Sequence, residues 1–262
     1  MINLIDFDSF GDSMADLGKA LKNALEKFRE QDTYYTFNKQ IGEILSASFE
    51  KLPSSVVQFS KSGWFLTKEM TFAEIHEMAE LVEKDEVATV DSFMTIHIQE
   101  NRNRIFETLL KRFPDRSKIL ESGIHAHESQ DYFASIPIFL SQSDGLCYQI
   151  TGYKLYTTEK KRPKVAKYHD NLQEDTFDHV LLKALTVSSS LNAHEANMNE
   201  YKGALNRHEV LHGLSVDYGT ELNSCKSISL LNFIGEILWK CEFEKNKKGN
   251  KANHDDDLKN AT

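Results

Sequence analysis

Proline and glycine are scarce in this sequence, and their scarcity favours helices. The 262 residues include only 4 prolines and 12 glycines. Both residue types interrupt helices, whereas long amphipathic runs with few β-branched clusters fill most of the chain. We therefore predict an all-α protein. Its 40% hydrophobic and 27% charged residues are typical of a soluble chain with an ample core.

Cysteines are few, and no apolar run is long enough to cross a bilayer. The longest such run, Ile228 to Trp239, is interrupted by Asn232 and Glu236. The first ten residues carry two aspartates and lack the basic segment of a secretory signal. An odd, scattered set of cysteines indicates a reducing compartment and no cysteine-type zinc site. We therefore expect a cytoplasmic protein without a membrane partner. The cysteines are Cys147, Cys225 and Cys241.

Positive charge is also in deficit, because the net charge is −9. Nucleic-acid binding depends largely on neutralising phosphates, so any RNA contact needs a local basic patch. Residues 151–170 supply one, with lysines and an arginine interleaved with tyrosines. An exposed loop without a ligand explains the same residues, and both interpretations stay open. The candidate RNA-binding residues are Lys160, Lys161, Arg162 and Lys164.

Apolar residues recur at helical spacing through most of the chain. Pro53 and Pro114 are expected to end helices, and Trp64 is expected in the core. His125 and His127 lie two apart, on different helix faces, and are expected to be solvated or capping residues. The expected helices cover residues 13–30, 37–52, 71–84, 92–113, 177–191 and 221–241, with two more in 115–150 joined near 129–131.

The polar stretch from Ala204 to Gly219 is the strongest functional candidate. Asn206 is a good N-cap, and Glu209 follows three residues later, as in a capping box. Gly213 stands where a helix would end. The sequence therefore predicts one short helical turn, over residues 207–212, whose start carries the polar groups.

Three side chains on this turn point in two directions. His208 and His212 are four apart, so they share a face roughly 5–6 Å apart. Arg207 and His212 are five apart and diverge by about 140° on a regular helix. One copy of the turn cannot easily aim both at one small ligand, but two copies across a dimer axis could. We therefore predict a homodimer.

Arg207 to His212 also reads Arg-x4-His with a polar residue directly after the arginine. With the neighbouring Asp217-Tyr-Gly219 and the upstream block Ile136 to Gly145, this pattern resembles the HEPN superfamily. Its members are helical bundles, and many are metal-independent RNases that act as dimers in toxin–antitoxin and abortive-infection defence. The resemblance covers Arg112 to Leu238 and implies a HEPN-like four-helix bundle. We accordingly expect an extra N-terminal helical region over residues 1–100, the bundle over 101–243 and a disordered tail over 244–262.

The resemblance implies a role for each polar side chain of the turn. Arg207 would hold the scissile phosphate and stabilise its charge. His212 would act as general acid–base and His208 would orient either partner, with Asn206 and Glu209 supporting the turn. RNA brings its own nucleophile, the 2′-hydroxyl, so no cofactor or metal is expected. The implied partners are RNA, a second copy of the chain, and an antitoxin or regulatory protein.

Two alternatives remain open at this stage. Some HEPN relatives lack catalysis, so the chain could be a binding or sensor module for a protein, nucleotide or RNA. The letters His208-Glu-x-x-His212 also spell the zinc-peptidase motif, with two imidazole ligands and a glutamate base. Against that second reading, Gly213 follows the second histidine at once, where a zinc-peptidase helix usually continues.

Overall fold

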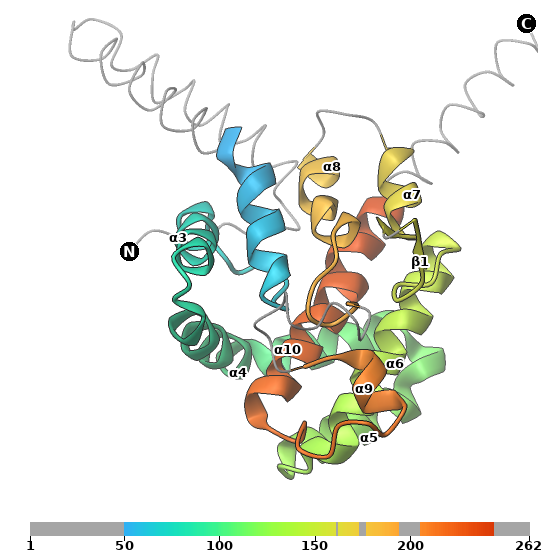
Figure 1. The fold of residues 1–262 in the computed structure, drawn as a ribbon. Coiled ribbons are helices and arrows are strands. Elements are labelled where there is room, and N and C mark those ends of the chain that lie inside the picture. The colour runs from blue at the N-terminus through green and yellow to red at the C-terminus, as the bar shows by residue number, and fades with distance from the viewer. Residues whose placement is uncertain (1–49, 161, 173–176, 194–204, 244–262) are drawn as a thin grey trace, which may run out of the picture.

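The computed structural model describes residues 50–160, 162–172, 177–193 and 205–243. The expected helix over 13–30, most of that over 37–52, Lys161 and the tail 244–262 lie outside these residues. Within them the prediction of an all-α fold is confirmed, because helices dominate and a single two-stranded hairpin is present (Figure 1). None of the described helices is long and apolar enough to span a membrane.

The elements follow one another along the chain after a helical segment at 50–61. They are α3 (Phe72–Glu83), α4 (Val87–Arg112), η2 (Pro114–Arg116), α5 (Ser117–Glu128), α6 (Tyr132–Thr151), β1 (Thr158–Glu159), β2 (Arg162–Pro163), α7 (Ala166–Asp170), α8 (Phe177–Leu182), η3 (Lys183–Thr186), α9 (Arg207–Leu211), α10 (Glu221–Asn232) and η5 (Phe233–Leu238).

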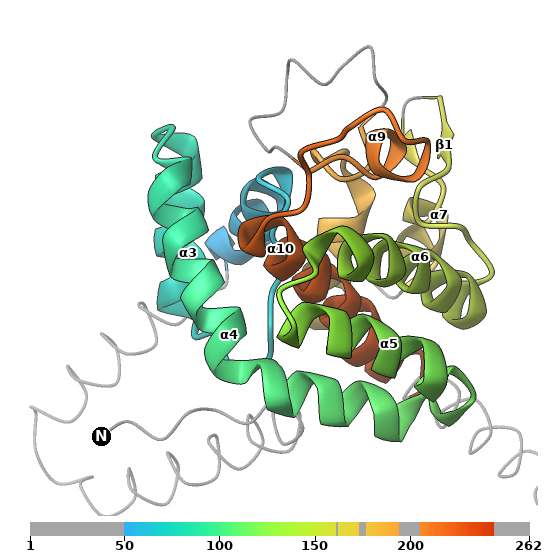
Figure 2. The ribbon, with the colours of Figure 1, turned by 90° about the horizontal axis from the view of Figure 1, so that it is seen from below.

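Helix α10 is the centre of the fold and packs against both α4 and α6 (Figures 1 and 2). Every residue from Asn223 to Asn232 is buried, so its serines and asparagines lie inside the protein with its leucines. The serine hydroxyls of Ser227 and Ser229 donate to backbone carbonyls of their own helix. The long helix predicted over 221–241 is continuous in the structure, and α10 changes within it to the π-helical η5.

The α5–α6 pair follows the prediction for residues 115–150. Asp131 caps α6 by accepting from the backbone N–H of Ala134 at 3.2 Å, and Gln130 in the connection has a positive φ of 62°. A Cβ atom at Gly123 would lie 2.8 Å from the Phe139 ring, so glycine lets the two helices approach closely. Short connections of this kind join antiparallel neighbours.

The N-terminal residues share one hydrophobic core with the rest of the chain. Leu52 and Phe59 from the segment at 50–61 are in the same buried cluster as residues of α10 and η5. Trp64 is fully buried, as expected, and donates its indole N–H to Asp91 at 2.8 Å. The predicted boundary at residue 100 falls inside α4, which runs unbroken from Val87 to Arg112.

Three sequence expectations are wrong. Pro53 does not end a helix, because the helical segment continues to residue 61 and buries Val56 beyond it. The helix expected over 177–191 stops at Thr186, since Val187 is extended (φ −115°, ψ 154°). His127 is buried at 3% exposure, with its Nδ1 2.8 Å from the Ser224 hydroxyl, and not solvated. Helical periodicity alone does not reveal which face a neighbouring helix will cover.

Candidate functional site

Helix α9 is held at its start by the buried side chain of Asn206. The amide oxygen accepts from the backbone N–H groups of His208 at 2.8 Å and Glu209 at 3.2 Å, as predicted for an N-cap. The amide nitrogen donates to the carbonyls of Ser190 at 2.8 Å and Ala193 at 2.9 Å. Asn206 therefore fixes α9 to the segment that follows η3.

The end of α9 is set by Gly213, whose φ is +71°. Its N–H donates to the carbonyl of Val210 at 3.2 Å, and the N–H of Leu214 donates to the carbonyl of Glu209 at 2.8 Å. This pair of bonds is a Schellman motif, which glycine favours because it adopts the left-handed conformation freely. His212 is consequently the C-cap of a five-residue helix and does not lie inside a continuing one.

The two histidines of α9 lie together, as their spacing predicted. Their ring centroids are 4.4 Å apart, with 52° between the ring planes. His208 is half-buried, whereas His212 is exposed. The pair thus places one imidazole in solvent with a second imidazole directly beside it.

Arg207 extends instead toward Tyr156, in the segment that follows α6. Its guanidinium carbon lies 5.0 Å from the centre of the Tyr156 ring. Its Nε is buried and has no hydrogen-bond partner. Among the described residues, no hydrogen bond joins Arg207 to His212 and no carboxylate pairs with the arginine. A single chain therefore does not unite the predicted pair.

The sequence did not predict that Tyr156 is the partner of Arg207. Its hydroxyl donates to the carbonyl of Leu140 at 3.3 Å. Burial raises its pKa well above the ordinary value, the nearby Asp144 raises it further, and Arg207 opposes both. Tyr156 therefore stays a neutral aromatic platform beneath the guanidinium. A tyrosine in a basic loop signals stacking, but not which cation it will stack with.

The loop after α9 is apolar and exposed at its tip. Leu214 is 57% exposed and Val216 is 83% exposed, and Leu211 at the end of α9 is also solvent-accessible. Isolated exposed aliphatic residues are common, but three in six residues around a candidate site are typical of an interaction surface. We call Leu211, Leu214 and Val216 the apolar rim.

The far end of the same loop is anchored on α6. Pro137 has no backbone N–H, so the carbonyl of Phe133, four residues earlier, has no helical donor. The Tyr218 hydroxyl donates to that carbonyl at 3.0 Å, and its ring meets the Phe133 ring edge-on at 5.2 Å. A proline inside α6 thus creates the acceptor that holds the loop.

The basic segment 151–170 forms a small hairpin followed by α7. Arg162 donates two hydrogen bonds to Asp170, at 2.6 and 2.7 Å, so its guanidinium is already engaged. Lys160, at the hairpin turn, is exposed, and Lys164 is half-buried. Of the four candidate RNA-binding residues, Lys160 and Arg162 are described and exposed, and the guanidinium of Arg162 is already paired with Asp170.

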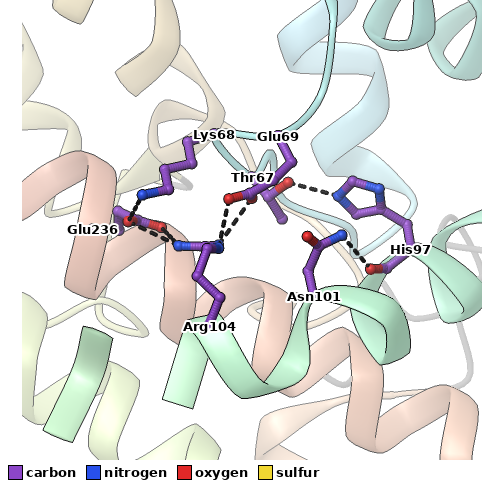
Figure 3. Close-up of polar contacts among 7 residues, drawn as sticks. All are labelled: Thr67, Lys68, Glu69, His97, Asn101, Arg104 and Glu236. Carbon is purple, nitrogen blue, oxygen red and sulfur yellow. Dashed lines mark hydrogen bonds and ion pairs between the residues drawn. The ribbon is translucent and has the colours of Figure 1, made fainter. Parts of the chain in front are cut away.

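A second polar cluster, which the sequence did not predict, lies on the other side of α10 (Figure 3). Arg104 of α4 donates to both oxygens of Glu236 at 3.0 and 2.9 Å and to Glu69 at 2.9 Å. Lys68 pairs with Glu236 at 3.3 Å. Burial raises the pKa of Glu69, and Arg104 partly offsets that rise. The only sequence signal was Glu236 itself, a charge inside an otherwise apolar run.

Three further residues extend this cluster, two of them on α4. The Thr67 hydroxyl lies 2.7 Å from Nε2 of His97, and the side chain of Asn101 donates to the His97 carbonyl at 2.9 Å. Burial lowers the pKa of His97. Cations and carboxylates balance within the cluster. Because its residues come from different elements, the cluster joins the segment before α3 to α4 and η5.

Metal ligation was the alternative use of His208 and His212. Among the described residues, no group of three or more histidine, cysteine, aspartate or glutamate side chains is arranged to hold a metal ion. The segment 194–204, immediately before the turn, lies outside those residues. All three cysteines are buried, and none of them forms a disulfide bond.

Comparisons of the chain with protein-family models, curated proteins and solved structures found no match. What the protein does must therefore follow from its own residues.

Proposed function

We propose that this protein is a metal-independent endoribonuclease of the HEPN type whose active site forms between two copies of the chain. The observation that carries the proposal is the paired imidazoles of His208 and His212 at an exposed helix end, next to an Arg207 that no carboxylate of the described residues neutralises. An unneutralised guanidinium is available for phosphate, and an exposed imidazole for proton transfer.

The reaction that suits these groups is transesterification within RNA. The 2′-oxygen forms a bond to phosphorus and loses its proton to a base, while the bond to the 5′-oxygen breaks and that oxygen takes a proton. His212 serves in this proton transfer, and His208 holds it in orientation. Arg207 stabilises the charge that develops on the phosphate oxygens. The products are a 2′,3′-cyclic phosphate and a free 5′-hydroxyl.

The second copy completes the site, because Arg207 and His212 of one chain extend apart. The apolar rim supports this arrangement, since Leu211, Leu214 and Val216 lie close to His212 in the sequence and are exposed in the single chain. For a chain of 30.0 kDa, light scattering is expected to give about 60 kDa. A 30.0 kDa particle at every protein concentration would count against a composite site.

The test is RNA cleavage by the purified full chain, with and without EDTA. Cleavage is expected from the wild type in EDTA and is expected to disappear in Arg207→Ala and His212→Ala. His125→Ala removes an equally exposed histidine elsewhere and is expected to cleave normally. Glu209→Gln is also expected to keep most of the activity. Zinc in the protein, with activity lost to EDTA and to Glu209→Gln, would support the zinc-peptidase reading.

A non-catalytic binding or sensor module is the second candidate. The stacking of Arg207 on Tyr156 favours it, because a half-buried guanidinium stacked on a ring is also what a non-catalytic role requires. A wild-type protein that cleaves no RNA, alone or with an antitoxin or regulatory partner removed, would decide for this candidate.

A further inference from the structure

A pocket of about 500 Å³ lies where the end of α4, the start of α5 and the middle of α6 meet. Its volume is in the range of small-ligand sites. Phe113 and Ile119 give it apolar walls, and Ile119 is 41% exposed. Five polar side chains also line it, namely Arg112, Asp115, Arg116, Gln142 and Gln149. None of these belongs to α9 or to the ion cluster around Arg104.

Within the part of the chain that the structure describes, no carboxylate forms an ion pair with Arg116, which lines this pocket. Its Nη1 donates to the amide oxygen of Gln142 at 2.8 Å, and its Nε and Nη2 donate to that of Gln149 at 3.1 and 3.0 Å. Both acceptors are neutral. Three of the five N–H bonds of a guanidinium are thus used, and two remain.

The guanidinium of Arg116 is also held in place before any ligand arrives. A Cβ atom at Gly145 would lie 2.9 Å from Nη1, so the absence of a side chain there lets the arginine lie along α6. Gln142 is 7% exposed, which makes it a fixed acceptor. A group whose rotamer is fixed in advance loses less entropy when it binds.

Arg112 adds a second guanidinium to the lining. It donates to the carbonyl of Gly235 at 2.8 Å, and its guanidinium carbon lies 4.2 Å from the centre of the Trp239 ring. The described lining of the pocket therefore includes two arginines and one carboxylate, Asp115.

We propose that this pocket binds a small oxyanion, a phosphate or carboxylate group, with Arg116 as the main contact. Planar guanidiniums suit these anions because they donate paired hydrogen bonds. Ile119 and Phe113 would contact the apolar part of a ligand that carries the anion. The site stands apart from the proposed cleavage of RNA, so either proposal survives the failure of the other.

The test follows the fluorescence of Trp239, which lies against Arg112, during titration of the full chain. The probes are inorganic phosphate and acetate at constant ionic strength set with chloride, and Trp239→Phe identifies the signal. The wild type is expected to respond saturably below about 10 mM to at least one probe. A response to phosphate alone assigns a phosphate ligand, and an equal response to acetate assigns an oxyanion in general.

The decisive variant is Gln149→Glu. The new carboxylate pairs with Arg116 in place of the ligand, and the side chain of Arg116 is expected to stay where it is. Binding is expected to weaken at least ~10-fold, because charge-assisted hydrogen bonds to the anion are lost. Gln58→Glu makes the same charge change on the distant segment 50–61 and is expected to leave binding within about twofold of the wild type. No saturable response from the wild type, or equal binding by Gln149→Glu, would overturn the proposal.

Discussion

Arg104 and Arg207 are both partly buried arginines, but their surroundings differ completely. Arg104 sits between Glu69 and Glu236, with four ion contacts of 2.5 to 3.0 Å (Figure 3). Arg207 lies over an aromatic ring, and no carboxylate of the described residues pairs with it. The first arginine is neutralised by its own chain. The second has no such neutralising partner within the part of the chain that the structure describes.

The histidines show the same division. His127 is enclosed among Phe106, Tyr132 and Phe139, and its Nδ1 lies 2.8 Å from the Ser224 hydroxyl. His212 is exposed beside the ring of His208. Partnered polar groups in the core stabilise a fold, whereas charged or titratable groups without partners at a surface are available for ligands. Mutations should therefore affect stability in the first region and activity in the second.

The largest effect on stability is expected for Arg104→Gln. This change leaves Glu69 and Glu236 partly buried without their shared cation, which costs about 3 kcal/mol of unfolding free energy. Urea denaturation measures it. Lys84→Gln is the control, because it removes an exposed pair with Glu80 in which both side chains are 61% exposed, and it should change the free energy by less than about 0.5 kcal/mol. Similar losses of unfolding free energy for both variants would contradict a stabilising role for the ion cluster around Arg104.

Acid should destabilise the core through His127. Burial, together with the nearby Arg102, lowers the pKa of this imidazole from 6.5 to about 4. Between these values the unfolded chain binds the proton more readily than the folded one. The contribution of His127 to the unfolding free energy is therefore fully present above pH 6.5 and is lost as the pH drops toward 4, by about 3 kcal/mol at most.

Urea denaturation across that pH interval tests the assignment with His127→Gln. The variant is expected to lose part of the slope but not all of it, because burial also lowers the pKa values of His97 and His169. If the unfolding free energy of the variant falls with pH as steeply as that of the wild type, His127 does not contribute to the acid destabilisation.

Asn206→Ala is expected to cost about 1.5 kcal/mol, which combines a lost N-cap with two carbonyls that lose their donor. Asn206→Asp keeps the capping oxygen but not the donations to Ser190 and Ala193, so its loss should be intermediate between wild type and Asn206→Ala. Thermal unfolding followed by circular dichroism separates the three proteins. Equal losses for both variants would mean that the cap contributes nothing.

The smallest effect on stability is expected for Arg207→Ala. It removes one cation–aromatic contact, worth about 1 kcal/mol or less at a partly exposed site. The same change is expected to abolish RNA cleavage. A loss of stability as large as that of Arg104→Gln would make Arg207 a structural residue.

The sequence predicted the local features of α9 well and the distant contacts poorly. Asn206 and Gly213 act through backbone groups within a few residues, so the start and end of the helix follow from local rules. The partner of Arg207 is Tyr156, far away in the chain, and helical periodicity carries no information on such pairs. The ion cluster around Glu236 was missed for the same reason, because its partners Arg104 and Lys68 come from other segments.

The central claim is that Arg207 and His212 act together only across two chains, and mixing two inactive variants tests it directly. Arg207→Ala and His212→Ala chains, each inactive alone, are unfolded together and refolded at equal concentration. About half of the dimers are then mixed, and each mixed dimer holds one intact site, so about a quarter of wild-type cleavage should return. A mixture that forms dimers but stays as inactive as its components would contradict the composite site.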